Sequence, residues 1–305
     1  MRHRTGRRVT HADVEREAAA AAAKPPSAVT ERRVRASPLA RRLAAEVGVD
    51  LSTVTGTGRN GVIGADDVRL AARTAPPAPD EQERRRENMR AAIAALMARS
   101  KREIPHYYLT ETIDLSRAML WLRERNRALP VPERLVPAVL LLKAAAQAAR
   151  TIPQLNGFWQ DNRFVPGAGV HLGVAIALRG GGLVAPAIHD ADQRDLSDLM
   201  AALRGLVERT RAGRLRSAEM SEPTITVSNL GDQGVESILG VIYPPQVALV
   251  GFGRVVARPW AVDGLLGIRP TVAASLAGDH RATDGATGAR YLRSIAQLLQ
   301  TPEEL

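Results

Sequence analysis

The chain of 305 residues contains no cysteine, and this absence removes several kinds of chemistry. Without a thiol the chain forms no disulfide, builds no thiolate metal site and carries no acyl group on a cysteine. Aromatic residues make up only 3% of the sequence, so the core built from its 45% hydrophobic residues must be aliphatic and rich in alanine. Lysine is also scarce: Lys24, Lys101 and Lys143 are the only three, and arginine carries the net charge of +10.

Long apolar runs are missing as well. The best candidate, residues 136–149, contains Lys143 and is shorter than the roughly 18 residues that span a bilayer. The arginines are scattered among acidic residues and form no stripe with aromatics, which disfavours nucleic-acid binding and favours an acidic protein partner or a phosphate-bearing substrate. The arginine-rich start includes Asp13, Glu15 and Glu17, which a transit peptide would lack. We therefore expect a cytoplasmic protein without nucleic-acid or membrane partners.

Two alanine- and proline-rich stretches, residues 18–26 and 74–80, are typical of extended linkers. The unit between them has the pattern of a small helical domain, in which Ser37 caps a first helix and the glycine-rich loop 56–61 precedes a second. Residues 8–14 resemble 62–68, either by coincidence or as the remnant of a second copy of this unit. The predicted order is an N-terminal segment with a linker, a helical domain, a linker and a large domain: residues 1–33, 34–72, 73–84 and 85–305.

The large domain alternates apolar strands with amphipathic helices. The predicted strands cover residues 107–114, 171–178, 183–188, 224–228, 246–254 and 269–276. The predicted helices cover residues 82–102, 116–128, 132–150, 196–212 and 286–299. This order predicts an α/β (α+β) fold, with one mixed sheet covered by helices on one face.

The stretch from Ala277 to Gly285, between the last strand and the last helix, carries the most specific chemical signal. His280 lies on the turn, where an imidazole with an unperturbed pKa of about 6.5 can act as a base; the alternative is a structural or solvent-facing histidine. Asp284 is expected to cap the helix or to pair with an arginine, and a direct catalytic role is the alternative. Gly285 is expected to permit close packing at the turn. The histidines at strand edges are expected to be structural: His106, His171 and His189.

Two parts of the sequence resemble domains of one known protein family. Residues 34–72, with Ser37-Pro38-Leu39-Ala40-Arg41-Arg42 and Gly56-Thr57-Gly58-Arg59-Asn60-Gly61, resemble a peripheral subunit-binding domain. Residues 85–305 resemble the catalytic domain of the dihydrolipoamide acyltransferases of 2-oxoacid dehydrogenase complexes. The motifs occur in the family's order: Met89-Arg90, Ile104-Pro105-His106, Pro153-Gln154-Leu155-Asn156-Gly157, Gly182-Leu183-Val184-Ala185-Pro186, Ser228-Asn229-Leu230-Gly231, Pro244-Pro245-Gln246 and Asp279-His280 through Asp284-Gly285.

The resemblance implies transfer of an acyl group, acetyl or branched-chain, from dihydrolipoamide to coenzyme A without a metal. It implies that His280 is the base and that the Ser228 hydroxyl stabilises the oxyanion, with Asn229 and Gly285 structural at the site. Members of the family are trimers that resemble chloramphenicol acetyltransferase, and each active site lies between two subunits. We therefore expect a homotrimer or a larger assembly, in which His280 meets Ser228 of a neighbouring chain.

The resemblance also implies partners. Arg41, Arg42 and Arg59 would form an electrostatic clamp on dihydrolipoamide dehydrogenase or on the decarboxylase component; the alternative is a solvated basic face. No lysine has the setting of a lipoyl hairpin, so the lipoyl group comes from another protein or from a domain that precedes this chain. A catalytically weak scaffold, or an acyltransferase for a small acceptor without a lipoyl group, are the competing hypotheses.

Overall fold

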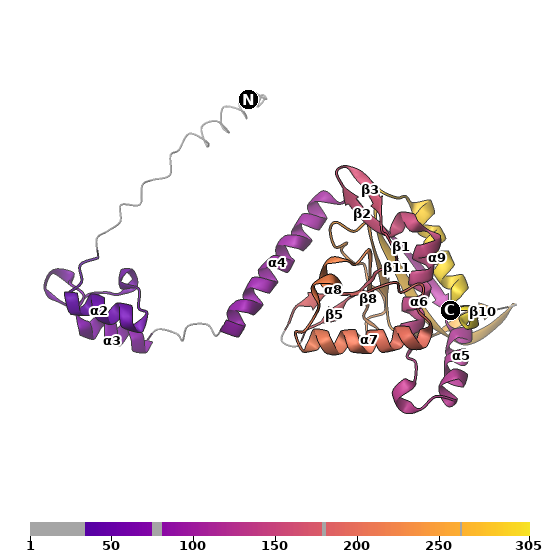
Figure 1. Ribbon diagram of the computed structural model, residues 1–305, viewed down its shortest axis with the longest axis horizontal. Helices are drawn as coiled ribbons and strands as arrows, with labels where there is room; N and C mark the ends of the chain where they lie inside the picture. The colour runs from indigo at the N-terminus through magenta and orange to yellow at the C-terminus, as the bar shows by residue number, and fades with distance from the viewer. Residues whose placement is uncertain (1–33, 75–80, 179–180, 263) are drawn as a thin grey trace, which may run out of the picture. The chain divides into compact units, whose positions relative to one another are not determined.

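The computed structural model describes residues 34–74, 81–178, 181–262 and 264–305. The chain divides into two compact units, residues 1–78 and 79–305 (Figure 1). The N-terminal segment and linker predicted over residues 1–33 lie outside the described residues.

The described residues of the first unit contain the α-helices α2 (Pro38–Val47) and α3 (Ala65–Thr74). The Ser37 hydroxyl accepts a hydrogen bond from the backbone of Ala40 and so caps α2 as predicted. Asp67 lies in the first turn of α3. Its carboxylate accepts hydrogen bonds from the backbone nitrogens of Thr57 and Gly64, which precede the helix, at 3.0 and 2.8 Å. These bonds tie the glycine-rich loop to α3. The small core contains Ala40, Ala44, Ile63 and Val68.

The second unit is formed around a mixed sheet with the strand order β1-β11-β9-β8-β4-β7, to which β10 is added by pairing with β11. The pairs β4–β8 and β8–β9 are parallel, and the other pairs are antiparallel. The strands of this sheet are β1 (His106–Asp114), β4 (Leu172–Val174), β7 (Ala187–Ile188), β8 (Ile225–Asn229), β9 (Ala248–Phe252), β10 (Val256–Val262) and β11 (Leu265–Asp279). Two small hairpins lie beside it: β2 (Gly157–Gln160) with β3 (Arg163–Pro166), and β5 (Ile176–Ala177) with β6 (Leu183–Val184).

In the second unit the structure describes the helices α4 (Glu81–Glu103), α5 (Ser116–Arg127), α6 (Pro137–Thr151), α7 (Leu196–Arg211), α8 (Ser217–Ser221) and α9 (Gly285–Leu298). They pack with the sheet and its connecting segments around one main core, to which α5, α6, α7 and α9 contribute buried residues. Figure 1 shows how these helices are arranged. Ten of the 15 residues of α6 are buried, and eight of these ten are alanine or leucine. Small side chains let α6 pack closely between the sheet and its neighbours. The aliphatic, alanine-rich core and the α/β (α+β) fold class predicted from the sequence are confirmed.

The two faces of the sheet are covered differently. Val250 and Leu276 point to the face that packs on the helices, whereas Leu249 and Ala277 point to the opposite face. That opposite face is covered by an irregular segment, in which Ile242 packs on the sheet. The segment is held in place where the Ser275 hydroxyl donates to the carbonyl of Ile238. Helices therefore cover one face, as expected, and an ordered loop covers the other.

Some elements differ from the predictions. The helix expected over 132–150 begins at Pro137, because a 3₁₀ turn and an extended stretch precede it. The β2–β3 hairpin, which turns at two residues with positive φ, and strand β10 were not predicted. Helix α3 extends to Thr74 and α4 begins at Glu81, so helices occupy both ends of the segment 73–84 that was expected to be a linker.

Candidate active site

His280 occupies the turn that follows the last residue of β11. Its backbone nitrogen donates a hydrogen bond of 3.0 Å to the carbonyl of Pro105, which ties the turn to the segment before β1. Its imidazole ring is exposed and lies edge-on to the ring of Tyr107, with the centroids 5.3 Å apart. The imidazole is therefore held in place on one side and open to a reactant on the other.

The residues on either side of His280 form a closed ion pair. The carboxylate of Asp279 is fully buried and accepts hydrogen bonds from Nε and Nη2 of Arg281, the shortest at 2.6 Å. The guanidinium of Arg281 also lies over the ring of Trp159 in β2, with its carbon 5.0 Å from the ring centroid. A bidentate pair combined with an aromatic contact fixes a guanidinium in one orientation. The turn that carries His280 is therefore clamped to the sheet and to the β2–β3 hairpin.

Tyr107 fills a slot between two glycines. A Cβ atom at Gly278 would lie 2.4 Å from the Tyr107 ring, and one at Gly288 would lie 3.0 Å from it. The Tyr107 hydroxyl is 2.9 Å from the hydroxyl of Thr283, within the same turn. A Cβ at Gly285 would meet no atom within 4 Å. The close packing expected at Gly285 is thus found at Gly278 and Gly288, because these two glycines face the aromatic ring.

Asp284 is the N-cap of α9, as the sequence suggested. Its Oδ1 accepts a hydrogen bond of 2.8 Å from the backbone nitrogen of Thr287. This hydrogen bond holds the pKa of the Asp284 carboxyl below its usual value. The carboxylate is exposed, so in the single chain its role is that of a helix cap and not of a buried ion pair.

Ser228 and Asn229 lie at the carboxyl end of β8, and both are partly buried. The side chain of Asn229 accepts a hydrogen bond of 2.9 Å from the backbone nitrogen of Gly231, which shapes the turn after the strand. This contact fixes the turn directly after Ser228.

Ser228 and His280 lie at opposite ends of the sheet within one chain. Ser228 is in register with Gly251 of β9, and Gly251 is in register with Ser275 of β11. From Ser275 the strand continues to Asp279 before His280 begins, about 13 Å along the strand, and the two strand spacings add about 10 Å across it. The two residues are therefore about 16 Å apart or more, too far to share one reacting carbon in a single chain.

The other histidines that the structure describes, His106, His171 and His189, contact protein groups. Nδ1 of His106 lies 2.9 Å from the carbonyl of Ile104, and its Nε2 accepts from the backbone nitrogen of Ile242 at 3.1 Å. Burial lowers the pKa of His106, in keeping with a neutral ring that donates at one nitrogen and accepts at the other. His171 and His189 stack edge-to-face, and His189 contacts the carboxylate of Glu222 at 2.7 Å.

In the first unit, Arg41, Arg42 and Arg59 are exposed. One nitrogen of Arg41 donates a hydrogen bond of 2.6 Å to the carbonyl of Val34, so part of its guanidinium is used inside the unit. Arg59 lies in the 3₁₀ turn of the glycine-rich loop. Within the described residues, no cluster of three histidine or acidic side chains is arranged to hold a metal ion. Nor is any described helix both long enough and apolar enough to cross a membrane.

Comparison with known proteins places the chain in a family. Residues 78–305 match the 2-oxoacid dehydrogenases acyltransferase (catalytic domain) family, and residues 34–69 match the e3 binding domain. The chain therefore belongs to the family of 2-oxoacid dehydrogenase acyltransferases, as the sequence motifs indicated.

Two curated relatives illustrate the similarity. The dihydrolipoyllysine-residue acetyltransferase component of the pyruvate dehydrogenase complex of Zymomonas mobilis is 32% identical over 290 residues, which is 88% of this chain and 66% of the relative. The lipoamide acyltransferase component of the branched-chain alpha-keto acid dehydrogenase complex of Bacillus subtilis is 30% identical, over 88% of this chain and 72% of the relative. For the relative from Caenorhabditis elegans the share is 57%, so the chain spans between half and three quarters of these proteins.

Solved structures agree with the fold of the second unit. The Azotobacter vinelandii dihydrolipoamide acetyltransferase is 25% identical with a TM-score of 0.67, covering 75% of this chain and 98% of that one. A probable dihydrolipoamide acetyltransferase from Listeria monocytogenes is 27% identical with a TM-score of 0.66, covering 75% and 96%. The mixed sheet described above is thus the fold of these acyltransferase structures.

Proposed function

We propose that this protein transfers an acyl group, acetyl or branched-chain, from dihydrolipoamide to coenzyme A within a 2-oxoacid dehydrogenase complex. The observation that carries the proposal is the His280 turn: an exposed imidazole whose backbone is pinned by Pro105 and whose neighbours are clamped by an ion pair. Such fixed geometry on one side and open access on the other is what a general base requires.

The chemistry follows from these groups. His280 takes the proton from the thiol of coenzyme A, and the thiolate attacks the carbonyl carbon of the acyl thioester. The hydroxyl of Ser228 from a neighbouring subunit donates a hydrogen bond to the resulting oxyanion. The intermediate then collapses: the bond to the dihydrolipoamide sulfur breaks, and that sulfur takes the proton back from the imidazolium. No acyl group is bonded to the protein at any step.

The spacing of the three residues supports these roles. A crystallographic and enzymatic study of the Azotobacter vinelandii enzyme concerns a serine, a histidine and an asparagine in its catalytic mechanism. In that enzyme the histidine follows the serine by 52 positions and the asparagine follows the histidine by 4. Ser228, His280 and Asp284 have the same two spacings, with an aspartate in the third place. Aspartate and asparagine are equally good N-caps, so a capping role suits both enzymes.

A shared site between subunits, in a homotrimer or a larger assembly, is supported by two features of the single chain. The first is that Ser228 and His280 lie at opposite ends of the sheet, about 16 Å apart or more. The second is the tip of the β10–β11 ribbon, where Leu265, Leu266 and Ile268 are 76–79% exposed. Three neighbouring apolar side chains so exposed are typical of a surface that a second protein chain covers.

The partners follow from the first unit and from the proposed substrates. An e3 binding domain at residues 34–69 supports binding of dihydrolipoamide dehydrogenase, or of the decarboxylase component, through Arg41, Arg42 and Arg59. The lipoyl group would reach the site on another domain or protein. Part of the net charge of +10 would attract the phosphates of coenzyme A.

A complementation experiment tests both the catalytic groups and the shared site. His280→Ala should lower the transfer rate between coenzyme A and dihydrolipoamide at least about a hundredfold, and Ser228→Ala about a hundred- to a thousandfold. Assemblies that contain both variant chains should regain activity, because some interfaces then pair an intact His280 with an intact Ser228. Full activity of His280→Ala would eliminate the assigned base, and inactive mixed assemblies would eliminate the shared site.

The second candidate is a scaffold that binds its partners and has little activity. It is favoured only by the absence of a lipoyl-type lysine among the three lysines of this chain. Robust turnover with free dihydrolipoamide would exclude it.

A further inference from the structure

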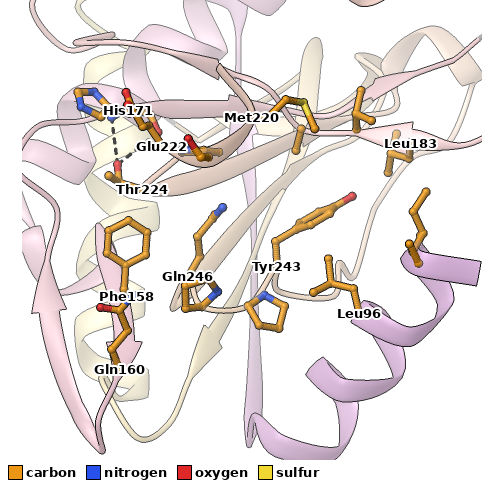
Figure 2. Close-up of a pocket in the computed structure, with 18 of the residues that line it drawn as sticks. Leu96, Phe158, Gln160, His171, Leu183, Met220, Glu222, Thr224, Tyr243 and Gln246 are labelled. Atoms are coloured by element: carbon orange, nitrogen blue, oxygen red, sulfur yellow. Dashed lines mark hydrogen bonds between the residues drawn. The ribbon is translucent and has the colours of Figure 1, made fainter. Parts of the chain in front are cut away.

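The short segment that contains α8 borders two pockets of the second unit. Met220 and Glu222 line a large pocket beneath α4, with a volume of about 750 Å³ and mostly apolar walls (Figure 2). Arg216 and Glu219 line a small pocket of about 150 Å³, whose other walls come from α7 and from the end of β7. Sites for drug-sized molecules occupy roughly 300–1,000 Å³, so the small pocket has room only for an ion or a very small molecule.

The small pocket carries an excess of positive charge. Its described lining includes three guanidinium groups, those of Arg194, Arg209 and Arg216. The only carboxylate in that lining belongs to Glu219. His189 lines the pocket as well, but its Nε2 atom lies 2.7 Å from a carboxylate oxygen of Glu222, which belongs to the wall of the large pocket. The guanidinium groups therefore exceed the carboxylate by two charges.

The single carboxylate is already used within the fold. Oε1 of Glu219 accepts hydrogen bonds from Nε and Nη2 of Arg209, at 3.1 and 2.6 Å. Oε2 of Glu219 accepts a hydrogen bond of 2.8 Å from the backbone nitrogen of Arg216. Glu219 is buried, so its pairing with Arg209 is a structural contact. Arg194 and Arg216 are then the groups that can receive a ligand.

Arg194 is held in position while two of its donor groups stay available. Nζ of Lys143 donates to the backbone carbonyl of Arg194, and Nε of Arg194 donates a hydrogen bond of 2.9 Å to the carbonyl of His189. Both Nη groups of Arg194 are left to donate. Within the part of the chain that the structure describes, no carboxylate pairs with the guanidinium of Arg194 or of Arg216. A guanidinium presents its donors as a fork that matches the oxygens of a phosphate.

We propose that this pocket binds a free tetrahedral dianion of the phosphate type, held between the guanidinium groups of Arg194 and Arg216. The two unneutralised charges match the two charges of the ligand, and the small volume excludes a nucleotide. The phosphates of coenzyme A are therefore not the ligand of this pocket.

The pocket is separate from both groups of the proposed acyl-transfer site. Ile188 of β7 and Ile225 of β8 are in register with the same residue of β4, which lies between them. Since β7 runs antiparallel to β8, His189 and Ser228 lie in opposite directions from this level, about 13 Å apart along the strands and about 10 Å across them. His280 follows β11, which is four strand spacings, about 19 Å, from β7. Binding of the dianion is thus measured without turnover and does not depend on acyl transfer.

Calorimetric titration of the purified full chain with inorganic phosphate, at pH 8 and constant ionic strength, tests the site. The titration is carried out with and without saturating coenzyme A, because coenzyme A fills any subsite for its own phosphates. We expect one phosphate to bind per chain when coenzyme A is present. Competition by coenzyme A that abolishes phosphate binding would assign the phosphate to the coenzyme A site and would overturn the proposal.

Two glutamine variants separate the pocket from general electrostatic attraction. Arg216→Gln removes one of the two guanidinium groups and should weaken phosphate binding at least about tenfold, the value of one hydrogen bond between charged groups. Arg214→Gln is the matched control, because Arg214 is also exposed but does not line the pocket. It removes the same charge two residues away and should bind phosphate like the parent chain.

A second pair of variants changes the volume of the pocket and keeps every charge. Ala202 lines the pocket, whereas its neighbour Ala201 is exposed and does not. Ala202→Phe should therefore weaken phosphate binding at least about tenfold, and Ala201→Phe should not. Circular dichroism checks the folding of each variant, and the exposed Arg216 decides the test if Ala202→Phe does not fold. The proposal is overturned if phosphate shows no saturable binding at millimolar concentration, or if the two glutamine variants bind it alike.

Discussion

The ring of Tyr107 meets the imidazole of His280 edge to face, with the centroids 5.3 Å apart and the planes inclined by 69°. The contact joins β1 to the turn after β11, two segments that are far apart in the sequence and paired in the sheet, where Tyr107 is in register with Gly278. The hydroxyl of Tyr107 extends the contact to Thr283. Tyr107 thus holds the turn at its start and near its end, and the orientation of His280 depends on it.

Removal of the Tyr107 ring should therefore impair His280 more than removal of the hydroxyl alone. We expect Tyr107→Leu to lower kcat for acyl transfer about tenfold or more with little change in KM, because a base that is no longer oriented loses part of its contribution. Tyr107→Phe keeps the ring contact and should retain most of the activity. Steady-state kinetics with coenzyme A and dihydrolipoamide distinguishes the two variants; equal activity of both would contradict an orienting role for the ring.

Asp284 offers a test that separates capping from catalysis. Asp284→Asn keeps an equally good N-cap, whereas Asp284→Ala removes the hydrogen bond to Thr287. We expect the asparagine variant to keep both the melting temperature and the activity, and the alanine variant to lower the melting temperature. Thermal unfolding followed by circular dichroism checks this. A large loss of turnover in the asparagine variant at an unchanged melting temperature would instead show that the charge of Asp284 takes part in the reaction.

Much of this site was predictable because its signals are local. The cap at Asp284 and the turn position of His280 follow from the boundary between an apolar strand and an amphipathic helix, and the structure places both there. The ion pair of Asp279 with Arg281 is also local. From the sequence, however, two charged residues in a turn are expected to be solvated, and only the structure shows that Asp279 is buried.

Other parts depend on pairings that a linear sequence does not reveal. The contacts of Tyr107 with Gly278 and Gly288 require the register between β1 and β11. Strand β10 was missed because neither of its faces is buried, so it has no run of core residues. The short β2–β3 hairpin was missed because its turn has two residues in the left-handed region and no glycine. The pocket beneath α4 is lined by segments from six separate stretches of chain, so no single motif marks it.

His106 should make stability depend on pH. Its pKa is lowered in the folded protein by burial, so the unfolded chain takes up a proton first as the pH falls below about 6.5. The free energy of unfolding should be fully retained above that pH and should decrease as the pH falls from 6.5 towards the lower pKa of the folded state. Lys101, Asp279 and Arg281 are the charged groups that act on the ring.

Urea unfolding at pH 7, 6 and 5 checks the prediction for His106. His106→Asn should show a smaller decrease in the free energy of unfolding between pH 7 and pH 5 than the parent chain, because one group with different pKa values in the two states has been removed. A decrease of the same size in both proteins would assign the pH dependence to other groups.

The ion pair of Asp279 and Arg281 should be the most sensitive polar contact of the turn. Asp279 is fully buried, whereas the side chain of Arg281 is 31% exposed, so the two partners are not equivalent. Arg281→Leu leaves a carboxylate buried without its partner and should lower the free energy of unfolding by about 3 kcal/mol or more. Asp279→Asn leaves a guanidinium that still reaches water and should cost less. In the double variant the loss should be smaller than the sum of the single losses, because no unpaired buried charge remains.

Urea unfolding followed by circular dichroism, at one protein concentration, measures the stability of all three variants. Arg127→Leu is the control, since Arg127 pairs with Glu124 on an exposed helix surface and its loss should change stability little. If Arg281→Leu were as mild as this control, the clamp on the His280 turn would have to come from Tyr107 and Pro105 alone.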